Sequence, residues 1–133
     1  MTPEQFIDAA LWFPETDESE PFGPGPMVYK IAGQRMFALL SPGGDGGSAM
    51  VNLKCDPELA LELRAEFPAV TPGWHMSKRH WNSVRLDGTV PDDELLEMLE
   101  HSYRLVARGL RRADRDRVLA VLGEDSPTID TEH

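Results

Sequence analysis

The spacing of apolar runs and turn residues in the first half of the chain is the feature that most constrains the fold. Two β-compatible runs, Met27 to Ile31 and Met36 to Leu40, are joined across Ala32-Gly33-Gln34. A connection of hairpin length favours antiparallel pairing, because parallel strands need a crossover of a dozen or more residues. A third run, Ala49 to Lys54, follows the glycine-rich turn at Pro42 to Gly47. We therefore predict an antiparallel sheet.

Helix starts are marked by proline beside polar and acidic residues. Thr2-Pro3-Glu4 and Asp56-Pro57-Glu58 share this pattern, which is typical of a helix N-terminus because proline suits the first helical position and a side-chain oxygen caps it. The longest predicted helix follows Pro91 and carries three acids in its first turn, where the helix dipole favours them. Gly109 is predicted to end or kink this helix, and Asp114 to cap a last one.

These elements predict a single α+β domain. Their order is helix, three strands, helix, two strands and two helices, which gives a five-stranded antiparallel sheet packed with helices. Residues 14–26 contain four prolines and four acids, and we predict an extended surface loop there. The domain is predicted to span residues 1–123, followed by an acidic, flexible tail at residues 124–133.

Length and composition favour a small globular protein of the cytoplasm. A chain of 133 residues can bury one substantial core. No apolar run approaches the ~20 residues that a membrane span needs, and the N-terminus lacks the pattern of a secretory signal. The single cysteine, Cys55, excludes an internal disulfide and fits a reducing compartment.

The net charge of -10 would normally oppose nucleic-acid binding, because two polyanions repel each other. Its distribution weakens that objection. Residues 1–26 carry six acids and residues 124–133 carry four, with no lysine or arginine in either segment. Residues 27–123 carry 13 acids and 13 basic residues. The middle of the chain is therefore balanced, and nucleic acid stays open as a partner.

The segment from Pro72 to Val84 combines two tryptophans, two histidines and the adjacent cations Lys78 and Arg79. Cations beside flat rings suit phosphate contact with base stacking. Large aromatic residues also fill cores, and the sequence leaves both interpretations open. The candidate nucleic-acid-binding residues are Lys78, Arg79, His80, Trp81, Asn82 and Arg85, joined by Lys30, Arg35 and Lys54.

Patterns for catalysis or metal binding are weak. The chain has no Gly-x-Ser-x-Gly motif, and His75 and His80 are five residues apart without a second cysteine to complete a zinc site. Cys55 is better explained as a small buried residue than as a reactive thiol. We predict a non-enzymatic protein with no cofactor and no metal.

Two helical features have simple explanations in the sequence. His101 is predicted to make a surface hydrogen bond. Four arginines, at 104, 108, 111 and 115, would form one stripe if the helix continued past Gly109, and a solvated face that follows the helix dipole explains them.

Several uncommon residues recur in a familiar order along most of the chain. They are Pro21-Phe22-Gly23, Tyr29-Lys30, Gly33, Met36-Phe37, Asn52 to Glu58, Pro72 to Met76, Lys78, His80 to Asn82, Val84, Asp87-Gly88 and His101 to Val106. From about residue 3 to residue 110, the chain resembles the MmcQ/YjbR-like family. The resemblance implies a five-stranded α+β domain of the CyaY-like or secretion-chaperone-like type. It also implies DNA binding through a proposed double-wing arrangement of strands, and no catalytic residues.

Three functions follow as hypotheses. The first is a non-catalytic nucleic-acid-binding domain that uses the basic-aromatic segment at residues 74–85, with DNA as the expected partner. The alternative is a protein-interaction or chaperone-like adaptor that uses the same sheet surface, as a monomer or weak homodimer. A third is a small-molecule pocket lined by Trp74, His75, His101 and Tyr103. None of these involves a membrane.

Overall fold

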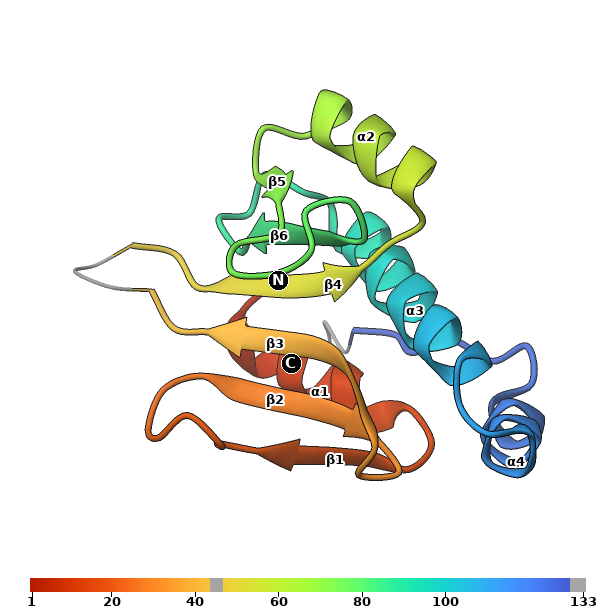
Figure 1. Cartoon of the computed structure of the whole chain (residues 1–133). Helices are drawn as coiled ribbons and strands as arrows, with labels where there is room; N and C mark the ends of the chain where they lie inside the picture. Colours follow the sequence, from red (N-terminus) through yellow and green to blue (C-terminus); the bar gives the residue numbers. More distant parts are fainter. Residues whose placement is uncertain (44–46, 130–133) are drawn as a thin grey trace.

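The structure is a computed structural model that describes residues 1–43 and 47–129. Part of the predicted glycine-rich turn (residues 44–46) and part of the predicted tail (residues 130–133) lie outside the described residues. A six-stranded antiparallel sheet has the order β1-β2-β3-β4-β6-β5 (Figure 1). The strands are β1 (Thr16–Ser19), β2 (Met27–Ile31), β3 (Arg35–Ser41), β4 (Met50–Lys54), β5 (Val70–Pro72) and β6 (Trp81–Arg85).

Four helices accompany this sheet: α1 (Pro3–Trp12), α2 (Pro57–Glu66), α3 (Asp92–Arg108) and α4 (Arg112–Leu122). Figure 1 shows α1 and α3 behind the sheet, α2 beyond the β5–β6 side and α4 beside the end of α3. None of the helices in the described part of the chain is long and apolar enough to cross a membrane. Helices α1 and α3 cover one face of the sheet, whereas α2 contacts β5 and β6 and α4 contacts α3.

The prediction of an α+β domain with an antiparallel sheet is confirmed, but the predicted number of strands is wrong. The additional strand is β1, which lies inside the segment predicted as a surface loop. It pairs with β2 from Thr16↔Ile31 to Ser19↔Val28. Its sequence has no apolar alternation because three of its four side chains are exposed at the edge of the sheet, so the usual strand signal is missing.

The local turn and cap signals were mostly informative. The hairpin between β2 and β3 is confirmed, as is the capping box in which Thr2 and Gln5 exchange hydrogen bonds. Gly109 ends α3. The predicted cap at Asp114 is wrong, because α4 already begins at Arg112 and Asp114 lies in its first turn.

Aromatic rings and one serine fix α3 against the sheet. The Phe13 and Tyr103 rings stack at 4.6 Å between centroids, and the Phe37 ring meets the Tyr103 ring edge-on at 5.0 Å. The Ser102 hydroxyl donates to the Phe37 carbonyl and accepts from the backbone N–H of Lys54, at 2.8 Å. A helix residue thus joins β3 to β4 from the core side.

Candidate functional site

The face of the sheet opposite α1 and α3, here called the open face, carries no helix of the described chain. Side chains alternate between the two faces along a strand. Val51 and Val84 pair in the core, so the neighbouring pair Asn52–Ser83 belongs to the open face. The cross-strand pair Lys54–Trp81 follows two residues further along and lies on the same face. The open face therefore combines a basic and an aromatic side chain at one end of β4 and β6.

A loop at residues 73–80, here called the Trp74 loop, folds back over the open face. The Gly73 N–H donates to the Trp81 carbonyl at 2.8 Å. A Cβ on Gly73 would lie 2.7 Å from the Trp81 Cβ, which is closer than real side chains approach. Only glycine therefore lets the loop begin so close to β6.

Two polar residues of the sheet hold the backbone of Trp74. Its N–H donates to the Ser83 hydroxyl at 2.9 Å, and its carbonyl accepts from the Asn52 amide at 3.4 Å. The Ser83 hydroxyl in turn donates to the Asn52 carbonyl oxygen. Since each polar atom of this buried pair has a partner, the loop is anchored to β4 and β6 while the Trp74 ring stays 57% exposed.

The other end of the Trp74 loop is fastened to α2 by Arg64. Its Nε donates to the Asn82 amide oxygen at 2.7 Å, and its Nη2 donates to the carbonyls of Lys78 and, at 3.3 Å, Trp81. The His80 carbonyl accepts from the Cys55 N–H at 2.8 Å. Arg64 is thus a cross-link between the helix, strand β6 and the loop.

An apolar groove of about 300 Å³ lies between the Trp74 loop and the loop at residues 20–26. We call it the aromatic groove, and its main lining residues are Phe22, Met36, Leu39, Trp74, His75 and Met76. The Phe22 side chain is 72% exposed at its rim. The His75 ring lies 4.1 Å from the Trp74 ring, on a backbone with φ of 58°. A non-glycine residue rarely adopts that conformation, and such strain concentrates at functional sites.

The predicted basic-aromatic segment is split by the fold. Lys78, Arg79 and His80 are exposed. Lys78 and Arg79 line a separate shallow hollow with α2, whereas Trp74 to Met76 line the aromatic groove. The sequence neighbours therefore face two adjacent surfaces rather than one.

Asn82 is not an available binding residue, which corrects its place among the candidates. Its side chain is 2% exposed. The amide oxygen accepts from Arg64, and the amide nitrogen donates to the Ala60 carbonyl at 3.5 Å. It is part of the support for α2.

The remaining predicted cations are spread over the sheet. Lys54 neighbours Trp81 on the open face, whereas exposed Arg85 lies at the opposite end of β6 with its Nε 3.8 Å from Asp87. Lys30 lies opposite Asp17 across β1 and β2. Arg35 begins β3, and its guanidinium lies beside Gly109 at the end of α3. Of this set, Lys54, Trp81, Lys78, Arg79 and His80 share one end of the sheet.

Sequence reasoning missed three lining residues of the aromatic groove, Met36, Leu39 and Phe22. Met36 and Leu39 belong to a strand predicted from its apolar character, and apolar residues of a strand give the same signal on a core face and on an open face. Phe22 lies in a segment where proline and glycine indicated only a loop. Its exposure is visible in the structure alone.

The proposed grouping of Trp74, His75, His101 and Tyr103 is not formed. Tyr103 is buried in the core, where its hydroxyl donates to the Pro14 carbonyl at 2.6 Å. His101 lies on α3, and its Nε2 accepts from the Asp56 N–H at 3.1 Å. Both residues lie on the helix side of the sheet, while Trp74 and His75 lie on the open side.

Cys55 is buried, as predicted. Burial raises the pKa of its thiol to about 11, with a smaller contribution from the charge of Asp56. The neutral thiol is therefore the form present at physiological pH, and it is a poor nucleophile. Among residues 1–43 and 47–129, no three histidine, cysteine, aspartate or glutamate side chains come together in a way that could hold a metal ion.

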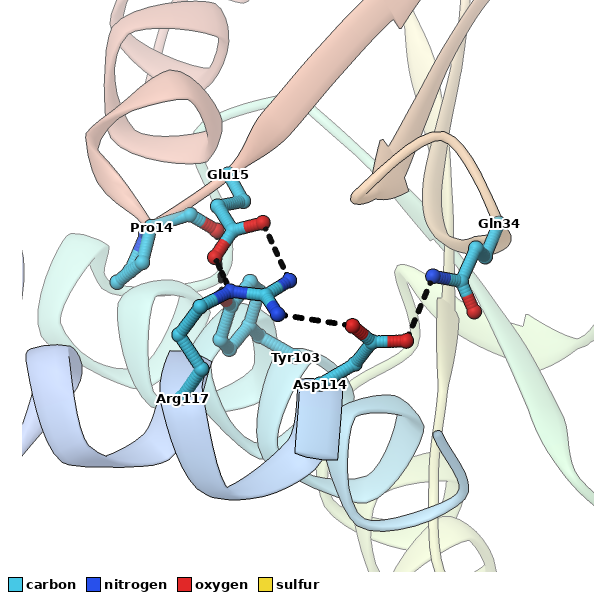
Figure 2. Close-up of polar contacts among 6 residues, drawn as sticks. All are labelled: Pro14, Glu15, Gln34, Tyr103, Asp114 and Arg117. Carbon is cyan, nitrogen blue, oxygen red and sulfur yellow. Dashed lines mark hydrogen bonds and ion pairs between the residues drawn. The ribbon is translucent and has the colours of Figure 1, made fainter. Parts of the chain in front are cut away.

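A charged cluster joins α4 to the β-hairpin end of the sheet (Figure 2). Arg117 donates from Nε and Nη2 to the two carboxylate oxygens of Glu15, at 2.6 and 2.8 Å. Its Nη1 donates to Asp114 at 2.9 Å, and Gln34 donates to the other Asp114 oxygen at 3.0 Å. The bond from Arg117 lowers the pKa of Glu15. Since these groups satisfy one another, the cluster is a structural clamp on α4.

The predicted arginine stripe is interrupted, because α3 ends at Arg108 and α4 begins at Arg112. Arg104 donates to Glu100 at 3.0 Å and to the Gly123 carbonyl at 3.0 Å. This arginine therefore supports the end of α4.

The sequence from Leu11 to Leu105 decides the family. The YjbR family model matches residues 11–105. The chain belongs to the YjbR family. YbdF of Escherichia coli O157:H7 is 37% identical over 109 residues, which cover 82% of this chain and 87% of YbdF. YjbR of Escherichia coli K12 is 43% identical over 54 residues, which cover 41% of this chain and 46% of that protein.

Solved structures show the same fold as this YjbR-family chain. Deinococcus radiodurans protein DR2400 has a TM-score of 0.78 at 34% identity, over 99% of this chain and 95% of that one. A crystal structure of a Pseudomonas syringae protein has a TM-score of 0.70 at 32% identity, over 79% and 98% of the two chains. The resemblance inferred from the sequence motifs is thereby confirmed, and the YjbR match contains all the residues of the aromatic groove.

Proposed function

We propose that this YjbR-family domain is a non-catalytic binding protein that takes single-stranded nucleic acid on its open face. The observation that carries the proposal is the exposed Trp74 ring, held in place by backbone hydrogen bonds to Asn52 and Ser83. Stacking a base on an aromatic side chain contributes about 1–3 kcal/mol. A ring whose backbone is already fixed loses little further entropy on stacking.

The surroundings of Trp74 support this ligand class. Exposed rings on an antiparallel sheet with one uncovered face provide a stacking platform for unpaired bases. Phe22 adds a second exposed ring across the aromatic groove. Bases within a duplex would be inaccessible to both rings, which favours single strands over double strands.

Charge on the open face also supports an anionic ligand. Lys30, Lys54 and Arg85 alternate onto this face, and Lys78 and Arg79 are exposed on the adjoining loop. The paired strands contribute one acid to the face, Asp17, within the described residues. Because charges are screened beyond roughly 10 Å at 0.1 M salt, this local excess counts for more than the net charge of the chain.

Fluorescence anisotropy with labelled single-stranded DNA, single-stranded RNA and duplex DNA tests the proposal. We expect binding to the single strands that weakens as salt rises. Trp74→Ala should weaken it by about fivefold or more, and Lys78→Glu with Arg79→Glu by about tenfold or more at low salt.

The matched control for charge is Arg111→Glu with Arg112→Glu, at the exposed start of α4. It changes the net charge by the same amount but lies away from the open face. Equal losses in the two double variants would show that net charge alone governs binding. No binding to any single strand at low salt would refute the proposed function.

A second candidate function is capture of an apolar peptide in the aromatic groove, as a protein-interaction adaptor would do. The lining favours it, since Met36, Leu39 and Met76 carry no charge and methionine adapts to different partners. Glu20, in the loop that forms one wall of the groove, and Asp17 of the neighbouring strand β1 would favour a basic flank on that side of the groove, away from the cations of β4 and β6. Titration with an Arg-flanked leucine peptide and its Asp-flanked counterpart tests this function, and Trp74→Ala should weaken only the first.

A further inference from the structure

A separate hollow lies on the helix side of the sheet, between α2 and α3. We call it the α2–α3 cavity, and its volume is about 110 Å³. Leu53 and Val84 from the strands, Leu63 from α2 and Met98 from α3 form its apolar lining. Each of these four side chains is at least nine-tenths buried. The cavity is therefore an extension of the hydrophobic core.

Its size suits a small hydrocarbon group. An engineered apolar cavity of about 150 Å³ in another protein stays dry and binds benzene. A volume of about 110 Å³ accommodates a branched alkyl group or a five-membered ring. Filling such a space adds dispersion contacts that the empty lining lacks.

Two carboxylates of α3, Glu94 and Glu97, stand at this cavity. They are three residues apart and lie on the same side of the helix. Neither has a salt-bridge partner within residues 1–43 and 47–129. Burial, followed by the charges of Glu97, Glu66 and Asp93, raises the pKa of Glu94. The carboxylates thus lack the cation that would offset their repulsion.

Nearby basic side chains are engaged elsewhere. Lys54 borders the cavity, but its position in β4 directs its side chain to the open face. Arg64 is bound to Asn82 and to the Trp74 loop. His101 accepts a hydrogen bond on Nε2 from Asp56, and burial lowers its pKa, so the imidazole is neutral. An apolar interior with an anionic mouth remains.

We propose that the α2–α3 cavity binds a small apolar amine, with its hydrocarbon part among Leu63, Val84 and Met98 and its ammonium group at Glu94 and Glu97. An apolar ligand with a negatively charged group would place that anion beside two carboxylates, and the repulsion would disfavour its binding. A neutral hydrocarbon would leave the carboxylates without a counter-charge. The site lies on the opposite side of the sheet from the aromatic groove, so it is independent of the proposed nucleic-acid function.

Methyl NMR titration of the full chain tests the site with cyclopentylamine as the probe. Cyclopentanol and cyclopentanecarboxylate share its ring and differ in charge. We expect the amine to shift the methyl signals of Leu63, Val84 and Met98, with millimolar affinity. The affinity of the alcohol should be lower by about tenfold or more, because a charged hydrogen bond is lost. The carboxylate should cause no shift. Equal shifts from all three compounds, or none from the amine, would overturn the proposal.

Two sets of variants separate the two parts of the site. Glu94→Gln with Glu97→Gln should weaken the amine about tenfold, whereas the matched pair Glu58→Gln with Glu62→Gln, exposed on α2, should leave it unchanged. Val84→Ile adds a methyl group to the lining, which takes up part of the cavity. This substitution should by itself reduce the affinity for the amine. Amine binding that survives in the Glu94 and Glu97 variant at full strength would refute the ionic part. These surface substitutions spare the core, so they remain informative even if Val84→Ile is unstable.

Discussion

Gly73 sets the position of the Trp74 loop because it has no side chain. The Cβ and the carbonyl group of Trp81 occupy the space where a Cβ at residue 73 would lie. The φ of Gly73 is not in the left-handed region, so the requirement is one of space and not of backbone conformation. A sequence shows the glycine but cannot show which of these two reasons applies.

Gly73→Ala should therefore displace the loop from β6. Overpacking a buried site costs about 1–3 kcal/mol, and we expect a loss of stability in that range by urea denaturation. Nucleic-acid affinity should fall with it, because the Trp74 ring loses its fixed position.

Ser77→Ala, at an exposed position of the same loop, is the matched control and should behave as the wild type. A Gly73→Ala protein of unchanged stability would show that the contact with Trp81 relaxes at little cost.

The candidate site was partly predictable at the level of single residues. Trp74, Lys78 and Arg79 were noticeable in the sequence because cations beside tryptophans suit phosphate contact with base stacking. The tryptophans could equally have belonged to the core. Asn82 was indistinguishable from them in the sequence, since a buried amide bound to Arg64 and an amide that reads a base use the same residue type. The deciding contact, from α2 to β6, joins residues 18 apart, which local patterns do not report.

At the scale of elements, α4 is held by the clamp of Glu15, Asp114, Arg117 and Gln34 (Figure 2). Glu15 itself has a φ of 53°, and the Ala32 N–H donates to its carbonyl at 2.7 Å. The turn before β1, the β2–β3 hairpin and α4 therefore meet at one place. These residues are up to 102 positions apart, and no signal in the sequence connects them.

Lowering the pH should weaken this clamp. Arg117 lowers the pKa of Glu15 in the folded state, so its contribution to stability is present above the ordinary glutamate pKa of about 4.3. That contribution is lost as the pH falls through the lower folded value. We expect Glu15→Gln to reduce the melting temperature by a few degrees or less at pH 7, as is usual for exposed ion pairs. The difference from the wild type should shrink towards zero as the pH falls through the lowered pKa of Glu15.

Calorimetry from pH 2 to pH 7 measures this difference directly. Glu124→Gln, at an exposed acid that forms no salt bridge within residues 1–43 and 47–129, serves as the control. A Glu15→Gln defect that persists unchanged in acid would mean that the ion pair is not its cause.

Elements with caps and apolar periodicity were predictable, and β1 was not. Proline and acid positions gave three of the four helix starts correctly, and Gly109 gave the end of α3, because these residues act locally. Strand β1 pairs its backbone with the free edge of β2, and its polar side chains give no local strand signal. Pairing of that kind is a tertiary effect that overrides local propensity.

For the whole molecule, the distribution of charge matters more than its sum. The open face gathers cations, whereas the acid-rich start of α3 lies on the helix side. The chain after α4 also begins on the helix side, where the Ser126 hydroxyl donates to Glu100 and Pro127 is buried. The start of the predicted tail is thus packed against α3, and not laid across the groove.

Neutralising the four acids of residues 124–133 (Glu124→Gln, Asp125→Asn, Asp130→Asn and Glu132→Gln) should therefore have a weak, long-range effect on nucleic-acid binding. We expect affinity to rise about threefold or less at low salt and to be unchanged near physiological salt, where screening is stronger. Anisotropy at the two salt concentrations measures both values. A large gain that survives in high salt would mean direct competition between the tail and the ligand.

The edges of the sheet have a consequence for aggregation. A sheet edge presents unpaired backbone groups that can recruit another chain. Here one edge is β1, with charged Asp17 and Glu18, and the other is β5, which has three residues and ends in Pro72. Charge, shortness and a missing N–H each discourage the addition of a foreign strand. The molecule can therefore leave one sheet face free of helices for a ligand without offering a template for fibril growth.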